Sequence, residues 1–238
     1  DEFITIAERF KAKGYQTYGV TSNPNMNALF GFSQGFDEYG EAGIIFPWMK
    51  EKLSKSDRDS NPNSNYSDLE TATTITDRTL ALLDHNRVSE SDSPYFFIVT
   101  YIDPHKPYRA PKKYNQFVAQ NKSKTKGYDA GVNYADDEIG RLLKEMETRG
   151  LLENTTIIFT SDHGEGLNSH PKIPDSRGHG VILYDSNVHI PLFVHHSKLK
   201  PAVVPQLNSS IDLMPTWIDL FALEPDSSLP GVSLAPLV

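Results

Sequence analysis

The sequence predicts an α/β fold with a largely parallel central sheet and helices on both of its faces. Strand patterns alternate with helix patterns along the chain, which is typical of open parallel sheets. The run over residues 95–102 is nearly continuous in apolar residues, as expected for a strand that is covered on both faces. A second apolar run, residues 155–160, ends abruptly in Ser161-Asp162-His163-Gly164-Glu165. Open α/β sheets bind ligands at that end of their strands.

The first elements follow in chain order. Apolar residues recur at helical spacing over residues 3–12, and Gly14 ends that helix. Alternation over residues 16–22 predicts a strand, which an Asn-Pro-Asn turn ends. The aromatic and glycine-rich residues 30–36 predict a packed loop. Residues 50–66 are polar and rich in Ser and Asn, which indicates an exposed insertion.

The later elements alternate in the same way. A capping-box pattern at Ser67 predicts a helix over residues 67–85. A long amphipathic helix is predicted over residues 128–149, and a short strand over residues 191–195. Residues 210–223 predict a further helix with Pro215 in its first turn. We interpret residues 1–238 as a single, partial α/β domain.

Composition limits the class of protein. The 238 residues are 38% hydrophobic, which is enough for a sizeable core. The formal net charge is -8 and no Lys/Arg-rich run occurs, so we do not expect nucleic acid as a partner. No apolar run approaches the roughly 20 residues that a membrane-spanning helix needs. The chain has no cysteine, which excludes disulfides and thiolate metal sites within it.

Asp162 and His163 are candidate metal ligands. A carboxylate suits Ca²⁺, Mg²⁺ or Mn²⁺, and an imidazole shifts the preference somewhat toward Mn²⁺ or Zn²⁺. The alternative interpretation is an ordinary turn in which Asp162 caps the following residues. Two ligands do not make a tight site, so further carboxylates must come from elsewhere.

Histidines in three other places are candidate substrate contacts. His105 lies between two prolines, which stiffen the backbone that presents its ring as an acid or as a donor to an anion. His179 lies between two glycines, so the backbone there can approach a ligand closely. His170 is a weaker candidate in the same loop. The alternative for each is a histidine exposed in a loop or turn. The other four histidines are interpreted as structural.

A metal and several imidazoles around one oxyanion indicate hydrolysis of a sulfate or phosphate ester. The segments together resemble the sulfatase branch of the alkaline phosphatase superfamily, and they occur in the family's order over nearly the whole chain. The most specific match is the segment from Gly150 through Asp162-His163-Gly164-Glu165. The other matching segments are residues 5–17, Gly31-Phe32-Ser33-Gln34-Gly35-Phe36-Asp37, residues 94–108 with Pro-His-x-Pro-Tyr, residues 211–216 and residues 231–234.

The resemblance implies roles for these residues. Asp162 and His163 would ligate one divalent metal, Ca²⁺ first, with Mn²⁺ or Mg²⁺ as alternatives. His105 would contact the ester and assist the leaving group, and His179 would lie against the anion, with His170 as a further substrate contact. The substrate would be a sulfated small molecule or glycan.

The chain departs from the family pattern in what it lacks. Members start with a strand that carries Asp ligands, followed by a Cys-x-Pro-x-Arg or Ser-x-Pro-x-Arg segment that is matured to the formylglycine nucleophile. They usually continue into a small C-terminal subdomain. We therefore interpret the chain as a catalytic domain truncated at both ends, inactive by itself, whose formylglycine lies in the missing segment.

Two other functions stay open. A phosphodiesterase or phosphoethanolamine transferase of the same superfamily would use an unprocessed Ser or Thr as nucleophile. A non-catalytic, sulfatase-like binding domain would keep the fold alone. The retention of Asp162, His163, His105 and His179 together argues against this last interpretation.

Overall fold

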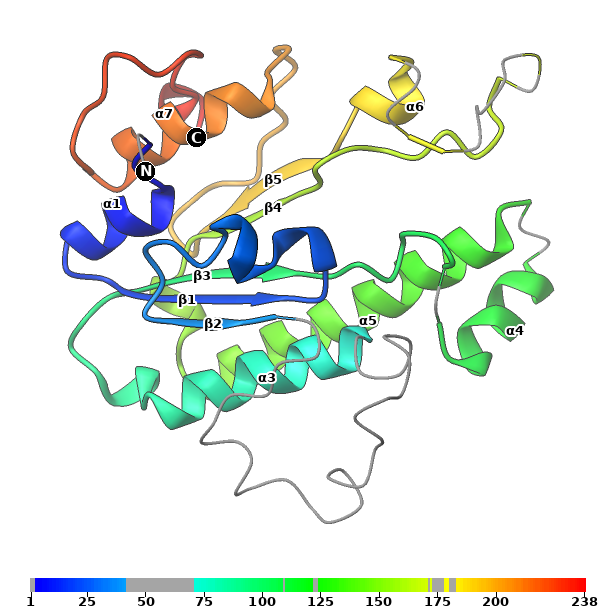
Figure 1. Ribbon diagram of the computed structural model, residues 1–238, viewed down its shortest axis with the longest axis horizontal. Helices are drawn as coiled ribbons and strands as arrows, with labels where there is room; N and C mark the ends of the chain where they lie inside the picture. The colour runs from blue at the N-terminus through cyan, green and yellow to red at the C-terminus, as the bar shows by residue number, and fades with distance from the viewer. Residues whose placement is uncertain are drawn as a thin grey trace. The chain divides into compact units, whose positions relative to one another are not determined.

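The computed structural model describes residues 3–41, 71–108, 110–121, 124–170, 172, 178–179 and 183–238. They form two compact units, here called the first unit (Asp1–Arg149 with Gln206–Leu237) and the second unit (Gly150–Pro205 with Val238) (Figure 1). The strands are β1 (Gln16–Thr21), β2 (Glu38–Gly40), β3 (Tyr95–Thr100), β4 (Ile157–Thr160) and β5 (Leu192–His195). The α-helices are α1 (Ile6–Ala12), α3 (Ala72–His85), α4 (Lys112–Gln120), α5 (Lys126–Thr148), α6 (Asp185–Val188) and α7 (Leu213–Leu220). Short 3₁₀ turns are Pro24–Met26, Ala28–Phe30, Val88–Glu90, Leu152–Asn154, Ser210–Asp212 and Ala235–Leu237.

The sheet of the first unit is parallel, with strand order β2-β1-β3. Tyr18 at the centre of β1 is in register with Glu38 of β2 and with Phe97 of β3. A parallel sheet needs cover on both faces. The predicted parallel sheet is confirmed.

Helices cover both faces of this sheet, with α1 and α7 on one face and α3 and α5 on the other (Figure 1). On the first face, Phe10 of α1 stacks on Phe96 of β3 with ring centroids 4.3 Å apart. Ile218 of α7 belongs to the same buried cluster as Phe10. Because successive side chains of a strand point to opposite faces, Phe97 lies on the other face, where α3 packs on β1 and β3.

Helix α1 begins at Ile6, three residues later than predicted, because Thr5 caps it. The Thr5 hydroxyl accepts the Glu8 N–H, and the Glu8 carboxylate accepts the Thr5 N–H at 2.8 Å. This reciprocal pair satisfies two backbone donors that a helix start leaves open. Helix α3 begins at Ala72, after an extended Thr71. The predicted capping box at residues 67–70 and the predicted insertion at residues 50–66 lie outside the described residues.

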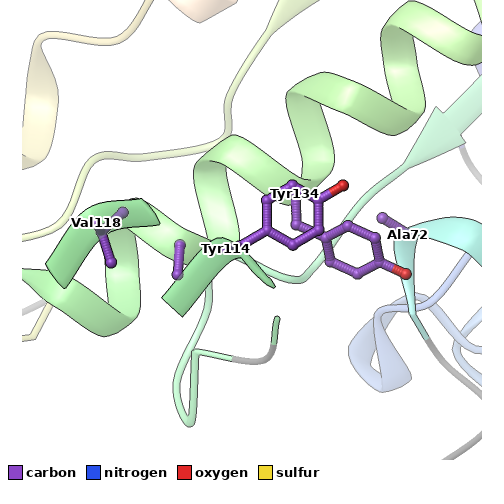
Figure 2. Close-up of a cluster of buried hydrophobic side chains, with 5 residues drawn as sticks. Ala72, Tyr114, Val118 and Tyr134 are labelled. Carbon is purple, nitrogen blue, oxygen red and sulfur yellow. The ribbon is translucent and has the colours of Figure 1, made fainter. Parts of the chain in front are cut away.

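A cluster of buried side chains joins α3, α4 and α5 beside the loop that follows β3 (Figure 2). Tyr114 of α4 and Tyr134 of α5 have ring centroids 5.0 Å apart, and Tyr101 packs against the same cluster. The cluster consists of Ala72, Tyr114, Val118, Ala130 and Tyr134. These contacts give the loop after β3 a rigid support.

The second unit contains an antiparallel pair, β4 and β5, in which Ile157 faces His195 and Thr160 faces Leu192. Both strands were predicted. The Thr160 hydroxyl donates to the Pro191 carbonyl at 2.9 Å, which fixes the end of β4. None of the helices in the described ranges combines the length and the apolar character that a membrane span requires.

Candidate functional site

Asp162 and His163 lie in a turn directly after β4, as predicted. The Ser161 hydroxyl donates to the His163 carbonyl at 2.7 Å, and the His163 N–H donates to Asp162 Oδ1 at 2.9 Å. Asp162 therefore caps the turn, as the alternative interpretation had it. It does so with one carboxylate oxygen, and the other oxygen faces the His163 ring.

The tautomer of His163 follows from its hydrogen bonds. Its Nδ1 lies 2.8 Å from the carbonyl oxygen of Gly164, and a carbonyl can only accept, so Nδ1 carries the hydrogen. In the neutral ring the lone pair is then on Nε2, which lies 3.5 Å from Asp162 Oδ2. Two electron-pair donors that face each other favour a cation beside them.

The donor set fits a divalent metal. The Asp162 and His163 side chains are 73% and 39% exposed, so a cation and its remaining ligands can reach them. No group of three or more His, Cys, Asp or Glu that could hold a metal occurs among the described residues. The metal site expected at Asp162 and His163, with further ligands from elsewhere, stays a prediction.

His179 lies against His163. The two rings are stacked, with centroids 3.9 Å apart and 24° between their planes. The structure therefore brings together Asp162, His163 and His179, which are separated by up to 17 positions in the sequence. The roles expected of these three side chains stay predictions.

Glu165 is a member of this group that the sequence interpretation missed as a site residue. Its Oε2 lies 3.5 Å from His179 Nδ1, and its side chain is only 6% exposed. Its Oε1 is buried without a hydrogen-bond partner in the described part of the chain. A buried carboxylate is costly without a compensating partner, so its place beside an imidazole marks it as part of the site. The only signal in the sequence was its position two residues after His163.

His170 packs elsewhere in the same loop. Its ring stacks on Tyr184 with centroids 3.8 Å apart and 12° between the planes. Its Nδ1 lies 3.0 Å from the Ser169 hydroxyl. The contact with substrate expected for His170 stays a prediction.

His105 is in the first unit, in the loop after β3. The backbone N–H of His105 donates to the Ile102 carbonyl at 2.8 Å. The Nδ1 atom of the His105 ring lies 2.6 Å from the Lys106 carbonyl oxygen. Nδ1 is again the donor, so in the neutral ring the lone pair is on Nε2. Asp103, which is buried, accepts the N–H of Ala72 at 3.1 Å and so ties the loop to the start of α3. The convergence of His105 with the residues of the second unit stays a prediction.

Tyr101 precedes this loop and stays neutral over the ordinary pH range. Burial raises the pKa of Tyr101 to about 12. Its phenol lies 2.9 Å from the Thr76 hydroxyl of α3. The side chain therefore acts as an anchor for the end of β3.

The Sulfatase family model matches residues 1–223. The chain belongs to the sulfatase family. Members of this family generally use a metal ion and a formylglycine residue. The recognition of the family from the sequence is confirmed.

Named relatives of the sulfatase chain are themselves sulfatases. An ulvan-active sulfatase of Formosa agariphila is 26% identical over 263 residues, which cover 100% of this chain and 50% of that protein. An N-acetylglucosamine-6-O-sulfatase of Bacteroides thetaiotaomicron is 32% identical over 128 residues, 53% of this chain and 21% of the relative. The chain spans half the length of these relatives or less.

Solved structures show the same fold. A protein of the alkaline phosphatase superfamily from Vibrio parahaemolyticus superposes with a TM-score of 0.68 at 23% identity, covering 98% of this chain and 51% of that chain. The predicted alkaline phosphatase/sulfatase-like α/β fold is confirmed.

Proposed function

We propose that the chain is part of the catalytic domain of a metal-dependent sulfuric ester hydrolase. Asp162 and His163 would hold one divalent cation, Ca²⁺ first, with Mn²⁺ or Mg²⁺ as alternatives. His105 and His179 would contact the sulfate ester of a small molecule or glycan. The observation that carries the proposal is the arrangement at the end of β4. There, Nε2 of His163 faces Asp162 Oδ2 at 3.5 Å, and the His179 ring stacks on the ring of His163.

The metal would supply Lewis-acid stabilisation of charge on the sulfuryl oxygens. The first contribution of the protein's own residues is to orient the His163 ring. The Gly164 carbonyl fixes Nδ1 of His163 as the hydrogen-bearing nitrogen, so Nε2 would be the nitrogen that holds the cation. The formylglycine nucleophile, which members of the family generally use, stays an expectation.

His105 would move the proton. With Nδ1–H held by the Lys106 carbonyl, a His105 ring that is also protonated on Nε2 would deliver that proton to the alcohol oxygen as the S–O ester bond breaks, and the neutral ring would remain. In its doubly protonated form, His179 would donate to a sulfuryl oxygen from Nε2 while its Nδ1 faces the Glu165 carboxylate. Such fixed donors are worth most where charge develops in the transition state.

The test uses the full-length protein that contains this chain. Hydrolysis of 4-nitrophenyl sulfate and of N-acetylglucosamine 6-sulfate would be compared with hydrolysis of bis(4-nitrophenyl) phosphate. We expect turnover of a sulfate ester that chelation removes and Ca²⁺ restores. Preference for the phosphodiester would instead support the phosphodiesterase alternative, and binding of sulfated sugars without turnover would support a binding domain.

The variant His163→Ala addresses the metal directly. It should lose both bound calcium and turnover, whereas His196→Ala, a histidine in the same unit interpreted as structural, should keep both. Undiminished turnover and metal content in His163→Ala would refute the assignment.

A further inference from the structure

One buried residue, Asn187 in α6, bonds to both segments that carry the site histidines of the second unit. It is only 5% exposed. Its backbone carbonyl accepts the N–H of Gly164, the residue after His163, at 2.8 Å. Its side-chain Nδ2 donates to the carbonyl of Gly178, the residue before His179, at 3.2 Å. A single residue therefore links the two turns from a third segment.

The orientation of the Asn187 amide follows from its partners. The Gly178 carbonyl can only accept, so Nδ2 faces it, and the Ser186 hydroxyl donates to Oδ1 at 3.1 Å. The Gly178 carbonyl also accepts the N–H of Gly166 at 3.1 Å. Both lone pairs of that carbonyl are thus used, which fixes the backbone that carries His179.

Gly164 allows the close approach of α6. A β-carbon at Gly164 would overlap the carbonyl oxygen of Ser186 and would lie 3.2 Å from the Cα of Asn187. Only glycine lets the turn after His163 lie directly on the backbone of α6. The contact between Asn187 and the His163 turn is therefore made by the backbone, and its contact with the His179 segment by the side chain.

We propose that the Asn187 side chain is a positioning residue that holds His179 stacked against His163. This inference rests on the proposed function, in which His179 contacts the sulfate group. Asn187 reaches neither substrate nor metal in this role and acts through the Gly178 backbone. Its amide is required because a carboxylate of the same shape has no donor for the Gly178 carbonyl.

The test variant is Asn187→Asp in the full-length protein. Aspartate keeps the acceptor for Ser186 and the backbone bond to Gly164, but it sets a carboxylate oxygen against the Gly178 carbonyl. With 4-nitrophenyl sulfate we expect kcat/KM to fall about 100-fold, since a misplaced group costs about that much. The calcium content should not change, because Asp162 and His163 keep their contacts. Asn154→Asp, an exposed position in the same unit, makes the same charge change and should leave both quantities as they are.

A double variant of Asn187 and His179 distinguishes a positioning role of Asn187 from a general loss of stability. If Asn187 acts through His179, the double variant Asn187→Asp/His179→Ala should be no slower than His179→Ala alone. Additive losses, or loss of calcium in Asn187→Asp, would overturn the proposal. Should Asn187→Asp not fold, Asn187→Ala, which introduces no charge, is measured in the same way.

A second measurement does not depend on turnover. In histidine-labelled protein with Ca²⁺, the stacked rings of His163 and His179 should give nuclear Overhauser contacts in the unmodified protein and in Asn154→Asp, but not in Asn187→Asp. Contacts that persist in Asn187→Asp overturn the positioning role whatever the activity. Contacts that are lost in a protein without sulfate ester turnover support the positioning role and refute the proposed function instead.

Discussion

Gly131 of α5 lies directly against the backbone of Asp103: a β-carbon on Gly131 would stand 2.5 Å from the Asp103 carbonyl oxygen and 3.1 Å from the Cα of Pro104. One turn earlier, a β-carbon on Gly127 would meet the Tyr108 ring at 3.1 Å. These two glycines share one face of α5. The loop that carries His105 therefore lies on a helix face without side chains.

Gly131→Ala should displace this loop. Forcing a methyl group into such a contact typically costs about 1–3 kcal/mol, and we expect the midpoint of urea unfolding to fall accordingly. Gly140→Ala is the matched change on the same helix, where a β-carbon meets nothing within 4 Å. It should raise stability by about 0.4–1 kcal/mol. Equal effects of the two substitutions would contradict the packing argument.

Asp162→Asn separates the hydrogen bond that Asp162 accepts within its turn from its proposed role as a metal ligand. Asparagine keeps an oxygen that can accept the His163 N–H, so the turn and the thermal stability should be retained. It loses the negative charge, so calorimetry should show calcium affinity weakened by more than about 10-fold, because the charge of the ligands sets Ca²⁺ affinity. Glu153→Gln removes a negative charge from the same unit outside the site and serves for comparison. Unchanged calcium affinity in Asp162→Asn would count against this carboxylate as a ligand.

Asp212 should make stability depend on pH in the acid range. The N–H groups of Val232 and Ser209 hold the pKa of Asp212 below its ordinary value. Their bonds to its two carboxylate oxygens are 2.9 and 2.8 Å long. A carboxyl with a lowered folded-state pKa contributes stability above its ordinary pKa, and that contribution is lost as the pH falls through the lowered value.

The measurement compares urea unfolding of the protein and Asp212→Asn between pH 7 and pH 3. Asp212→Asn should be less stable at pH 7, and the difference should shrink toward pH 3. Asp219→Asn, at an exposed position in the adjoining helix α7, makes the same charge change and serves for comparison. A gap between Asp212→Asn and the unmodified protein that stays constant over this range would contradict the linkage.

The alkaline range should show the opposite dependence. Burial raises the pKa of Tyr101 to about 12, and the same is true of Tyr18 and Tyr39. Above pH 10 the unfolded chain loses these protons first, so stability should fall as the pH rises toward 12. Tyr101→Phe should make this fall less steep in urea unfolding between pH 9 and pH 11. An unchanged slope would show that Tyr101 ionises as readily in the folded protein as in the unfolded chain.

The sequence predicted the elements whose pattern is local. The apolar run that forms β3 and the Thr-rich run that ends at Asp162 need no knowledge of their neighbours. Strand β2 was not predicted because it has only three residues, Glu38–Gly40, and exists through pairing with β1. Helix α4 was also missed. Its first residues are two lysines, and its buried side chains, Tyr114 and Val118, pack on other helices.

The residues of the candidate site also fall into those that the sequence could predict and those that it could not. Asp162, His163 and His179 could be proposed because their chemistry is visible in single residues. Glu165 and Asn187 could not, because their importance lies in burial and in partners that are distant in sequence. No sequence motif marks a polar residue that supports a site, so its role becomes visible only when the fold shows which residues it contacts.

The imidazoles of His105 and His163 share one device: each donates Nδ1–H to a carbonyl of the very next residue. The orientation of each ring is therefore fixed by a hydrogen bond within a dipeptide and does not depend on a residue that is distant in sequence. Surrounding loops can lengthen, shorten or change sequence without rotating either ring. In the proposed function, Nε2 of each ring would therefore keep its direction while the residues that contact the substrate change.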